Sequence, residues 1–207
     1  MTDDISQLDP LGDRLLSAAS EVFSERGYDR ATVSEIARRA GVTTGAIYSR
    51  FRGKADLMAE ALARTVGNEI DRLLPQAPEG GTALLGLLGH HLVDGEQQSE
   101  WLLMEAIVAS RRDPELADMI RHRLDGEHTR IAKIVDEGRS DGNIDPALDI
   151  GAVAHFSLAL GLGMSLQQLI NRPQPDANDW HPLIDRLLAA ARPLSGQPLS
   201  STQENLT

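Results

Sequence analysis

Two short helical patterns joined by a glycine lie between Thr32 and Leu57, and this stretch constrains the fold more than any other part of the chain. Thr32 and Glu35 have the spacing of a capping box, in which the hydroxyl accepts a hydrogen bond from a first-turn amide and the carboxylate reaches back. A helix is therefore expected to begin after this threonine. Its apolar residues recur at i, i+3, i+4 and i+7 and form one buried stripe of Val33, Ile36, Ala37 and Ala40.

Gly41 is expected to end this helix, because glycine adopts the left-handed conformation without the strain that a side chain adds. A second short helix is expected to start at Thr43 or Thr44. The residues expected on its buried side are Val42, Ile47 and Phe51, and those on its exposed side are Thr44, Gly45, Tyr48 and Ser49. Because the side chains on this exposed face are mostly small, the helix can enter a DNA groove, where its hydroxyl groups reach phosphates and base edges. Such a pair of helices is typical of a helix-turn-helix motif.

The charge of this stretch supports contact with DNA. Between Arg30 and Lys54 there are six basic residues and one acidic residue, a local charge of +5, and Lys54 is well placed for a phosphate. The whole chain carries −11, with 12 basic and 22 acidic residues from Ala59 onward. A protein that coats nucleic acid nonspecifically would be basic throughout. An ordinary helical hairpin with solvated arginines is the alternative, but the cap, the stripe, the turn and the polar face all favour DNA binding.

These residues resemble the amino-terminal motif of the tetracycline-repressor-like (TetR) family of transcriptional regulators, T-[VI]-x-[DE]-I-A-x-x-A-G-V-[ST]-x-G-x-[IL]-Y-x-x-F-x-x-K-x-x-L. Every fixed position of the motif is matched between Thr32 and Leu57. The resemblance implies DNA contacts at Thr32, Thr43, Thr44, Gly45, Tyr48 and Lys54, and Ser49 joins them from its place on the exposed face. Thr44 and Arg50 occupy positions at which members of the family differ, so the base preference stays open.

Helical patterns continue along the chain, and the expected fold class is all-α. Three Asp-Pro pairs offer an N-cap carboxylate followed by a proline in the first turn, at Asp9-Pro10, Asp113-Pro114 and Asp145-Pro146. Helices are expected over residues 10–26, 54–74, 81–95, 99–112, 114–138, 146–171 and 179–192. The expected domains are a three-helix DNA-binding domain (1–56), a helical effector-binding and dimerisation body (57–194) and a disordered tail (195–207).

Residues 150–170 form the most apolar segment, and their number would suffice to cross a membrane. His155, Gln167 and Gln168 interrupt the segment, and small residues suit close approach of another helix: Gly151, Ala154, Gly161 and Gly163. The TetR resemblance implies that the last two long helices pair with those of a second copy, so a homodimer is expected and a membrane span is not. One exposed stripe of the last helix should carry Trp180, Leu183, Ile184, Leu187 and Leu188.

The resemblance also implies a cavity for a small-molecule effector within the body. The residues expected to line it are Leu62, Val66, Trp101, Met104, Glu105, Val108, His122, Phe156, Leu160 and Met164. Aromatic residues make up only 3% of the chain, which favours a lipophilic or acyl-type effector over a flat cation. Glu105 is either partly exposed, paired with an arginine, or a polar anchor in this cavity. Adjacent helical residues diverge by about 100°, so His90-His91 indicates no metal site, and no cofactor is expected.

The expected function is that of a repressor, which leaves a palindromic operator when the effector displaces the helix beginning near Lys54. No G-x-S-x-G, H-E-x-x-H, Walker or dinucleotide glycine motif is present, and there is no cysteine. The chain is therefore not expected to be an enzyme. An architectural DNA-binding dimer without an effector, or a small helical enzyme, are the alternatives. Acidic residues near the start of the chain do not resemble a signal peptide, so a cytoplasmic location is expected.

Overall fold

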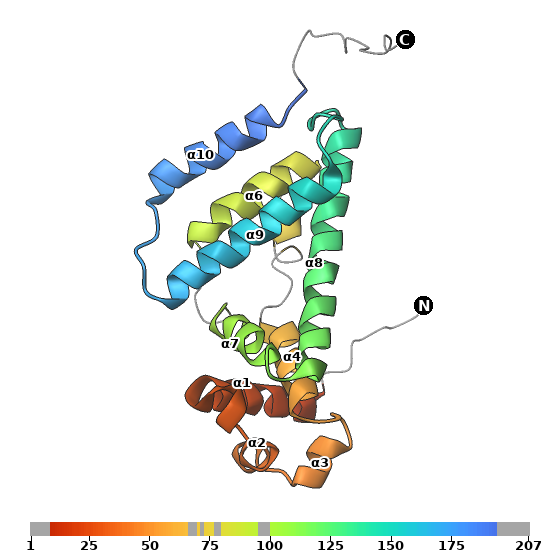
Figure 1. The fold of residues 1–207 in the computed structure, drawn as a ribbon, viewed down its shortest axis with the longest axis vertical. Helices are drawn as coiled ribbons and strands as arrows, with labels where there is room; N and C mark the ends of the chain where they lie inside the picture. The colour runs from red at the N-terminus through yellow and green to blue at the C-terminus, as the bar shows by residue number, and fades with distance from the viewer. Residues whose placement is uncertain (1–8, 66–69, 71–72, 77–79, 95–99, 194–207) are drawn as a thin grey trace, which may run out of the picture.

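The computed structural model describes residues 9–65, 70, 73–76, 80–94 and 100–193, and all regular structure within these ranges is helical. This result confirms the all-α class. The helices are α1 (Pro10–Arg30), α2 (Val33–Ala40), α3 (Thr44–Tyr48), α4 (Lys54–Thr65), the 3-10 turn η1 (Leu74–Gln76), α6 (Gly81–Asp94), α7 (Glu100–Ser110), α8 (Pro114–Ser140), α9 (Ile150–Leu169) and α10 (Ala177–Ala190). Helices α1 to α3 form a head at one end of the molecule, and α6, α9 and α10 lie at the other end (Figure 1).

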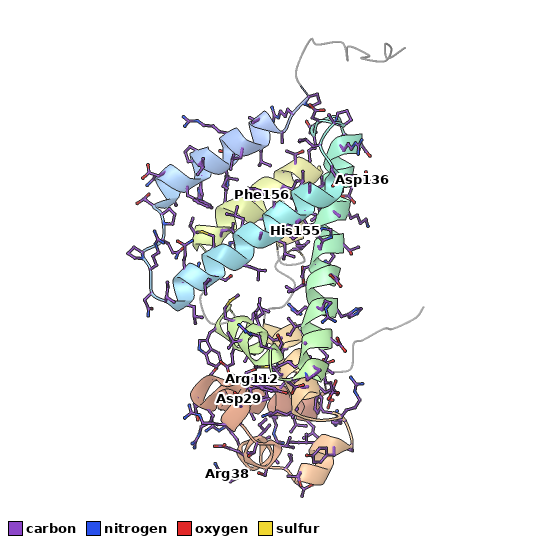
Figure 2. The ribbon with its side chains drawn as sticks, in the orientation of Figure 1. Asp29, Arg38, Arg112, Asp136, His155 and Phe156 are labelled. Carbon is purple, nitrogen blue, oxygen red and sulfur yellow. The ribbon has the colours of Figure 1, made fainter. Side chains whose placement is uncertain are left out.

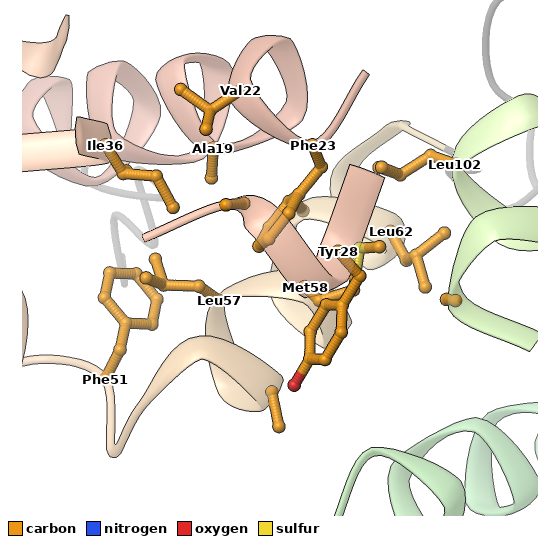
Figure 3. Close-up of a cluster of buried hydrophobic side chains, with 14 of the residues drawn as sticks. Ala19, Val22, Phe23, Tyr28, Ile36, Phe51, Leu57, Met58, Leu62 and Leu102 are labelled. Carbon is orange, nitrogen blue, oxygen red and sulfur yellow. The ribbon is translucent and has the colours of Figure 1, made fainter. Parts of the chain in front are cut away.

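The head shares its hydrophobic core with the nearest part of the body. This head-side cluster contains side chains of α1 to α4 together with those of α7 and the start of α8 (Figure 3). Its largest fully buried members are Leu15, Val22, Phe23, Ile36, Ile47, Leu57, Met58, Leu62, Leu102 and Leu116. The predicted domain boundary after residue 56 therefore falls within a continuous core, and the boundary itself stays a prediction.

A second core, the distal cluster, joins α6, the end of α8, α9 and one side chain of α10. Its buried members are Ile70, Leu73, Leu84, Leu85, Ile131, Ile134, Val135, Ile144 and Ala154, with Leu188 of α10 packed against them. Gly81 permits this packing at the start of α6. A Cβ atom there would lie 2.2 Å from the carbonyl oxygen of Ile134, so any side chain would push α6 away from α8.

Several helix ends differ from the sequence prediction. Helix α1 breaks at Gly27, as expected, but a further turn continues to Arg30. The predicted helix start at Asp145-Pro146 is wrong, because the Asp145 carboxylate accepts a hydrogen bond from the amide of Ala147 and forms a local turn. Helix α9 begins at Ile150 instead, capped by Asp149. Helix α10 begins at Ala177, two residues earlier than predicted. The predicted tail, residues 195–207, lies outside the described residues.

The expected exposed stripe of α10 divides into two faces. Trp180, Ile184 and Leu188 follow an i, i+4, i+8 spacing and turn toward α6, where the indole nitrogen of Trp180 donates to the carbonyl of Gly89 at 2.8 Å. Leu183 and Leu187 remain exposed. The prediction was wrong for the first three side chains because α6 supplies a partner within the same chain.

Helix α9 leaves much of its apolar surface open. It is the one helix among the described residues that is long and apolar enough to cross a membrane, but its exposed residues follow a single stripe. The large exposed side chains of α9 are Phe156, Leu166 and Leu169, and the exposed Ile170 follows at its C-cap. Gly161 faces α6, where a Cβ atom would lie 3.9 Å from Leu92, whereas nothing lies within 4 Å of the corresponding position on Gly163. Gly163, and not Gly161, therefore lies on the open face.

Candidate nucleic-acid interface and effector region

The turn between α2 and α3 has the geometry that its sequence predicts. The Thr32 hydroxyl accepts a hydrogen bond from the amide of Glu35 at 3.2 Å, which caps α2. The carboxylate of Glu35 pairs with Arg26 at 3.2 Å, so this side chain joins α2 to α1. Gly41 ends α2 with φ of 68°, in the left-handed region. Arg14 of α1 donates to the last carbonyl of α2, that of Ala40, at 2.6 Å and holds this end of the helix.

Helix α3 has one buried and one exposed face, as expected. Ile47 is completely buried in the head-side cluster, whereas the Tyr48 side chain is 59% exposed. Thr44, Gly45 and Ser49 are exposed beside it. The contact of these residues with DNA stays a prediction, but the structure brings them to one surface.

Two hydroxyl groups of this surface also stabilise α3. The Thr43 hydroxyl accepts from the amide of Ala46 at 3.2 Å, and that of Ser49 donates to the carbonyl of Ala46 at 2.9 Å. A hydroxyl offers one donor and two lone pairs. Thr43 therefore keeps its proton for an external acceptor, and Ser49 keeps a lone pair.

Lys54 lies at the first position of α4 and is anchored within the protein. Its ammonium group donates to the carbonyl of Tyr28 at 2.8 Å and lies 4.3 Å from the centre of the Tyr28 ring. An ammonium group has three donors. A DNA phosphate could therefore be bound while the contacts with Tyr28 remain.

Most arginines between residues 9 and 58 are paired with carboxylates, which the local charge count did not reveal. Arg39 forms two hydrogen bonds of 2.6 Å with Glu25 of α1, and this contact lowers the pKa of Glu25. Arg50 pairs with Asp9, and Arg52 with Asp56. Between residues 9 and 58 there are eight basic and seven acidic residues. The sequence window omitted the acidic residues of α1, which fold back onto the helix-turn-helix.

The candidate effector residues do not all come together. Leu62, Met104 and Met164 are buried, and Trp101 and Leu160 are half-buried. Val108, His122 and Phe156 lie on the surface of the chain, because their helices turn these faces outward. Val66 lies outside the described residues.

Glu105 is half-buried, which agrees with the first of the alternatives that the sequence left open, but its partner was not foreseen. Its carboxylate accepts a hydrogen bond from the backbone amide of Tyr28 at 2.5 Å, so this oxygen points to the head, and the role of Glu105 as a ligand anchor stays a prediction. No sequence pattern links residues 77 positions apart.

A small helix-turn-helix head on a larger helical body defines a DNA-binding transcriptional regulator. Residues 15–61 match the family described as bacterial regulatory proteins, tetR family, and residues 83–193 match that described as BetI-type transcriptional repressor, C-terminal. The chain belongs to the TetR family of transcriptional regulators. These two matches make it a DNA-binding transcriptional repressor.

Relatives are found by sequence and by structure. The fatty acid metabolism regulator protein of Bacillus subtilis is 29% identical over 140 residues, 66% of this chain and 72% of its own length. The A-factor receptor protein of Streptomyces griseus is 30% identical over 158 residues, 73% of this chain and 52% of its own length. The crystal structure of FadR from B. subtilis in complex with stearoyl-CoA shares the fold, with a TM-score of 0.70, 24% identity and coverage of 86% of this chain and 98% of the other.

Proposed function

We propose that the chain is a homodimer that binds a pseudo-palindromic operator through two copies of α3 and releases it when a lipophilic or acyl-type molecule enters the body. One observation carries this proposal: the same chain exposes a polar α3 face over a buried Ile47 at one end, and an apolar face of α9 and α10 at the other. The first face suits a groove, and the second requires an apolar partner.

The proposed dimer interface consists of the exposed apolar side chains of α9 and α10, with a second copy of the chain as their partner. These are Phe156, Leu166, Leu169, Ile170, Leu183 and Leu187. A short recognition helix makes few contacts alone, whereas two copies on a two-fold axis read half-sites about 34–36 Å apart or a multiple of that spacing. The proposed DNA contacts are Thr32, Thr43, Thr44, Gly45, Tyr48, Ser49 and Lys54.

The lipophilic effector is supported by composition and by the relatives. Leu62, Met104, Leu160 and Met164 offer aliphatic and thioether surface, and stearoyl-CoA is the ligand named for the B. subtilis structure. A regulator from Saccharomonospora viridis, 22% identical with a TM-score of 0.65, is described in complex with choline. A quaternary ammonium group favours aromatic faces. From Leu57 onward the chain has three aromatic residues, Trp101, Phe156 and Trp180, and the indole of Trp180 already binds Gly89.

The experiment that tests this proposal is a titration of the operator complex with stearoyl-CoA, choline and free coenzyme A. The DNA upstream of the gene serves first to locate the operator by footprinting. Release by stearoyl-CoA alone supports the proposal, whereas a complex that no ligand affects indicates an architectural DNA-binding dimer. Because the chain has no cysteine, a thiol reagent added to the same samples detects any coenzyme A released by thioester hydrolysis. Such turnover would favour an enzyme. A regulator that acts on DNA in this way belongs in the cytoplasm.

A further inference from the structure

Tyr28 lies where the head meets the body. It follows the break of α1 at Gly27, its side chain is 3% exposed, and its ring stacks on Phe23 of the head-side cluster (Figure 3). The ring, the hydroxyl, the amide and the carbonyl of this residue all contact other groups. Tyr28 therefore attaches the last turn of α1 to the rest of the protein through four different groups.

The body holds Tyr28 by two carboxylates from different helices. Glu105 of α7 accepts the Tyr28 amide at 2.5 Å, and Asp113 accepts the Tyr28 hydroxyl at 2.5 Å. The other oxygen of Asp113 accepts the amide of Leu116 at 3.1 Å and caps α8. Asp113 thus binds the head and the first turn of α8 with one side chain. We call Tyr28, Glu105 and Asp113 the Tyr28 latch.

Local features of the chain make room for the latch and support it. Gly27 has φ of 73°, and a Cβ atom there would lie 3.0 Å from the Glu105 carboxylate oxygen. Any other residue at this position would be strained and would crowd the carboxylate. Next to the latch, Arg112 pairs with Asp29 at 2.6 Å, and Figure 2 shows these two side chains at the junction of head and body. The hydrogen bond from Tyr28 lowers the pKa of Asp113, so the acceptor stays charged at neutral pH.

We propose that Glu105 and Asp113 are positioning residues that fix the orientation of the head and transmit movement of α7 to it. Met104 precedes Glu105 directly in α7 and belongs to the proposed effector region. A helix moves as a unit, so a ligand that displaces Met104 also displaces the carboxylate that holds Tyr28. This route runs from α7 to Tyr28 at the end of α1, a residue that Lys54 at the start of α4 also contacts. The inference rests on the proposed function, because it assigns a mechanism to the release of the operator.

The first test measures the orientation of the heads without DNA. Because the chain lacks cysteine, Ser34→Cys on the exposed surface of α2 gives one spin label per subunit. Double electron–electron resonance spectroscopy measures the distance between the two spin labels of a dimer and so reports the distance between its two heads. We expect one narrow distribution in the labelled parent, a distribution broadened at least about twofold in Glu105→Ala, and a narrow one in Glu105→Gln, whose amide oxygen retains the acceptor. Glu60→Ala, at an exposed position of α4, is the control.

The second test uses operator duplexes whose half-sites are moved apart by one and two base pairs. The wild-type dimer should bind the native spacing best, whereas Glu105→Ala and Tyr28→Phe should discriminate between spacings at least about threefold less. Affinities that fall by the same factor at every spacing, in step with a lower thermal midpoint, would assign the latch to stability alone and overturn the inference. Unchanged distances and unchanged spacing preference would overturn it as well. A wild-type protein that protects no DNA site would instead refute the proposed function, while the distance measurement would still test the latch.

Discussion

The head-side and distal clusters differ in how far a single chain encloses them. Among the described residues, six helices contribute buried side chains to the head-side cluster, and α7, which is apolar on almost every side, is largely buried there. Helix α9 is equally apolar, yet only Ala154 and Met164 of its side chains are buried. Two helices of similar composition therefore have opposite environments. The first cluster is complete in one subunit, whereas the second would be completed by the proposed second copy over α9 and α10.

The largest effect is expected from charges placed on the open face. In Phe156→Glu/Leu166→Glu, each subunit would bury two unpaired carboxylates, each costing about 3 kcal/mol or more, so the dimer should dissociate. Both side chains are exposed in the single chain, so its helicity should be retained. Sedimentation should give the monomer mass, and operator affinity should fall at least about a thousandfold.

Ala63→Glu, which adds a charge to the exposed surface of α4, is the matched control for this double variant and should leave the dimer intact. A double variant that retains the dimer mass would move the interface away from α9. Gly163→Leu tests the same face by adding a bulky side chain there. Gly161→Leu adds the same side chain at a position that faces α6 and is the variant with which its dimer mass is compared.

The next largest effect is expected in the closed cluster. Phe23 is fully buried among side chains of the head and stacks on Tyr28. Phe23→Ala should lower the free energy of unfolding by about 3–5 kcal/mol, because it removes buried surface and leaves a cavity. Denaturant unfolding should show the loss when it is followed by fluorescence in a Trp180→Phe background, where Trp101 of α7 is the one tryptophan. If Trp101 reports wild-type stability while helicity falls, head and body unfold separately and the two parts do not share one core.

A smaller effect is expected from the polar face of α3. Tyr48→Ala should weaken operator binding by roughly 1–3 kcal/mol, or about 5- to 150-fold, through the loss of a contact in each half-site. The residue is exposed, so the stability should change by less than about 0.5 kcal/mol. Fluorescence anisotropy with labelled operator measures the affinity, and Asp136→Ala, at an exposed position of α8, is the control. Wild-type affinity in the Tyr48 variant would remove this residue from the interface.

The smallest effect is expected in the ionisation of Tyr28, whose pKa reports whether the head-side cluster is closed to water. Burial, and then the hydrogen bond to Asp113, raises the pKa of Tyr28 well above its ordinary value of 10.0. The resulting stabilisation is fully present below pH 10 and is lost as the pH rises through the raised value. In Tyr48→Phe, Tyr28 is the only tyrosine, so the absorbance of tyrosinate near 295 nm should not develop around pH 10. Ionisation at pH 10 in the folded protein would show that this site is open to water.

The sequence predicted the local features of the fold because each depends on residues close together in the chain. The Thr32 cap, the turn at Gly41 and the two faces of α3 follow from spacings of one to seven residues. The Asp145-Pro146 pair shows the limit of such reasoning, because a turn uses the same carboxylate and proline as a helix start. Asp149 competes for the start of α9 four residues later.

Contacts between distant residues could not be predicted in this way. Glu105 was one acidic residue in an apolar helix, and nothing nearby in the sequence indicated that Tyr28 was its partner. The pairing of Arg39 with Glu25 depends on the packing of α2 against α1. The divided face of α10 depends on α6. In each case the missing information was the partner supplied by tertiary packing.

The pairing of the head arginines has a consequence for how binding responds to ionic strength. Affinity for DNA falls with added salt in proportion to the number of counterions that protein cations displace from the phosphates. An arginine such as Arg39, already neutralised by Glu25, displaces fewer counterions than a solvated one. The plot of log affinity against log salt concentration should therefore be shallower than the eight basic residues between positions 9 and 58 would give. Discrimination between operator and other DNA should depend more on the fit of α3 than on charge.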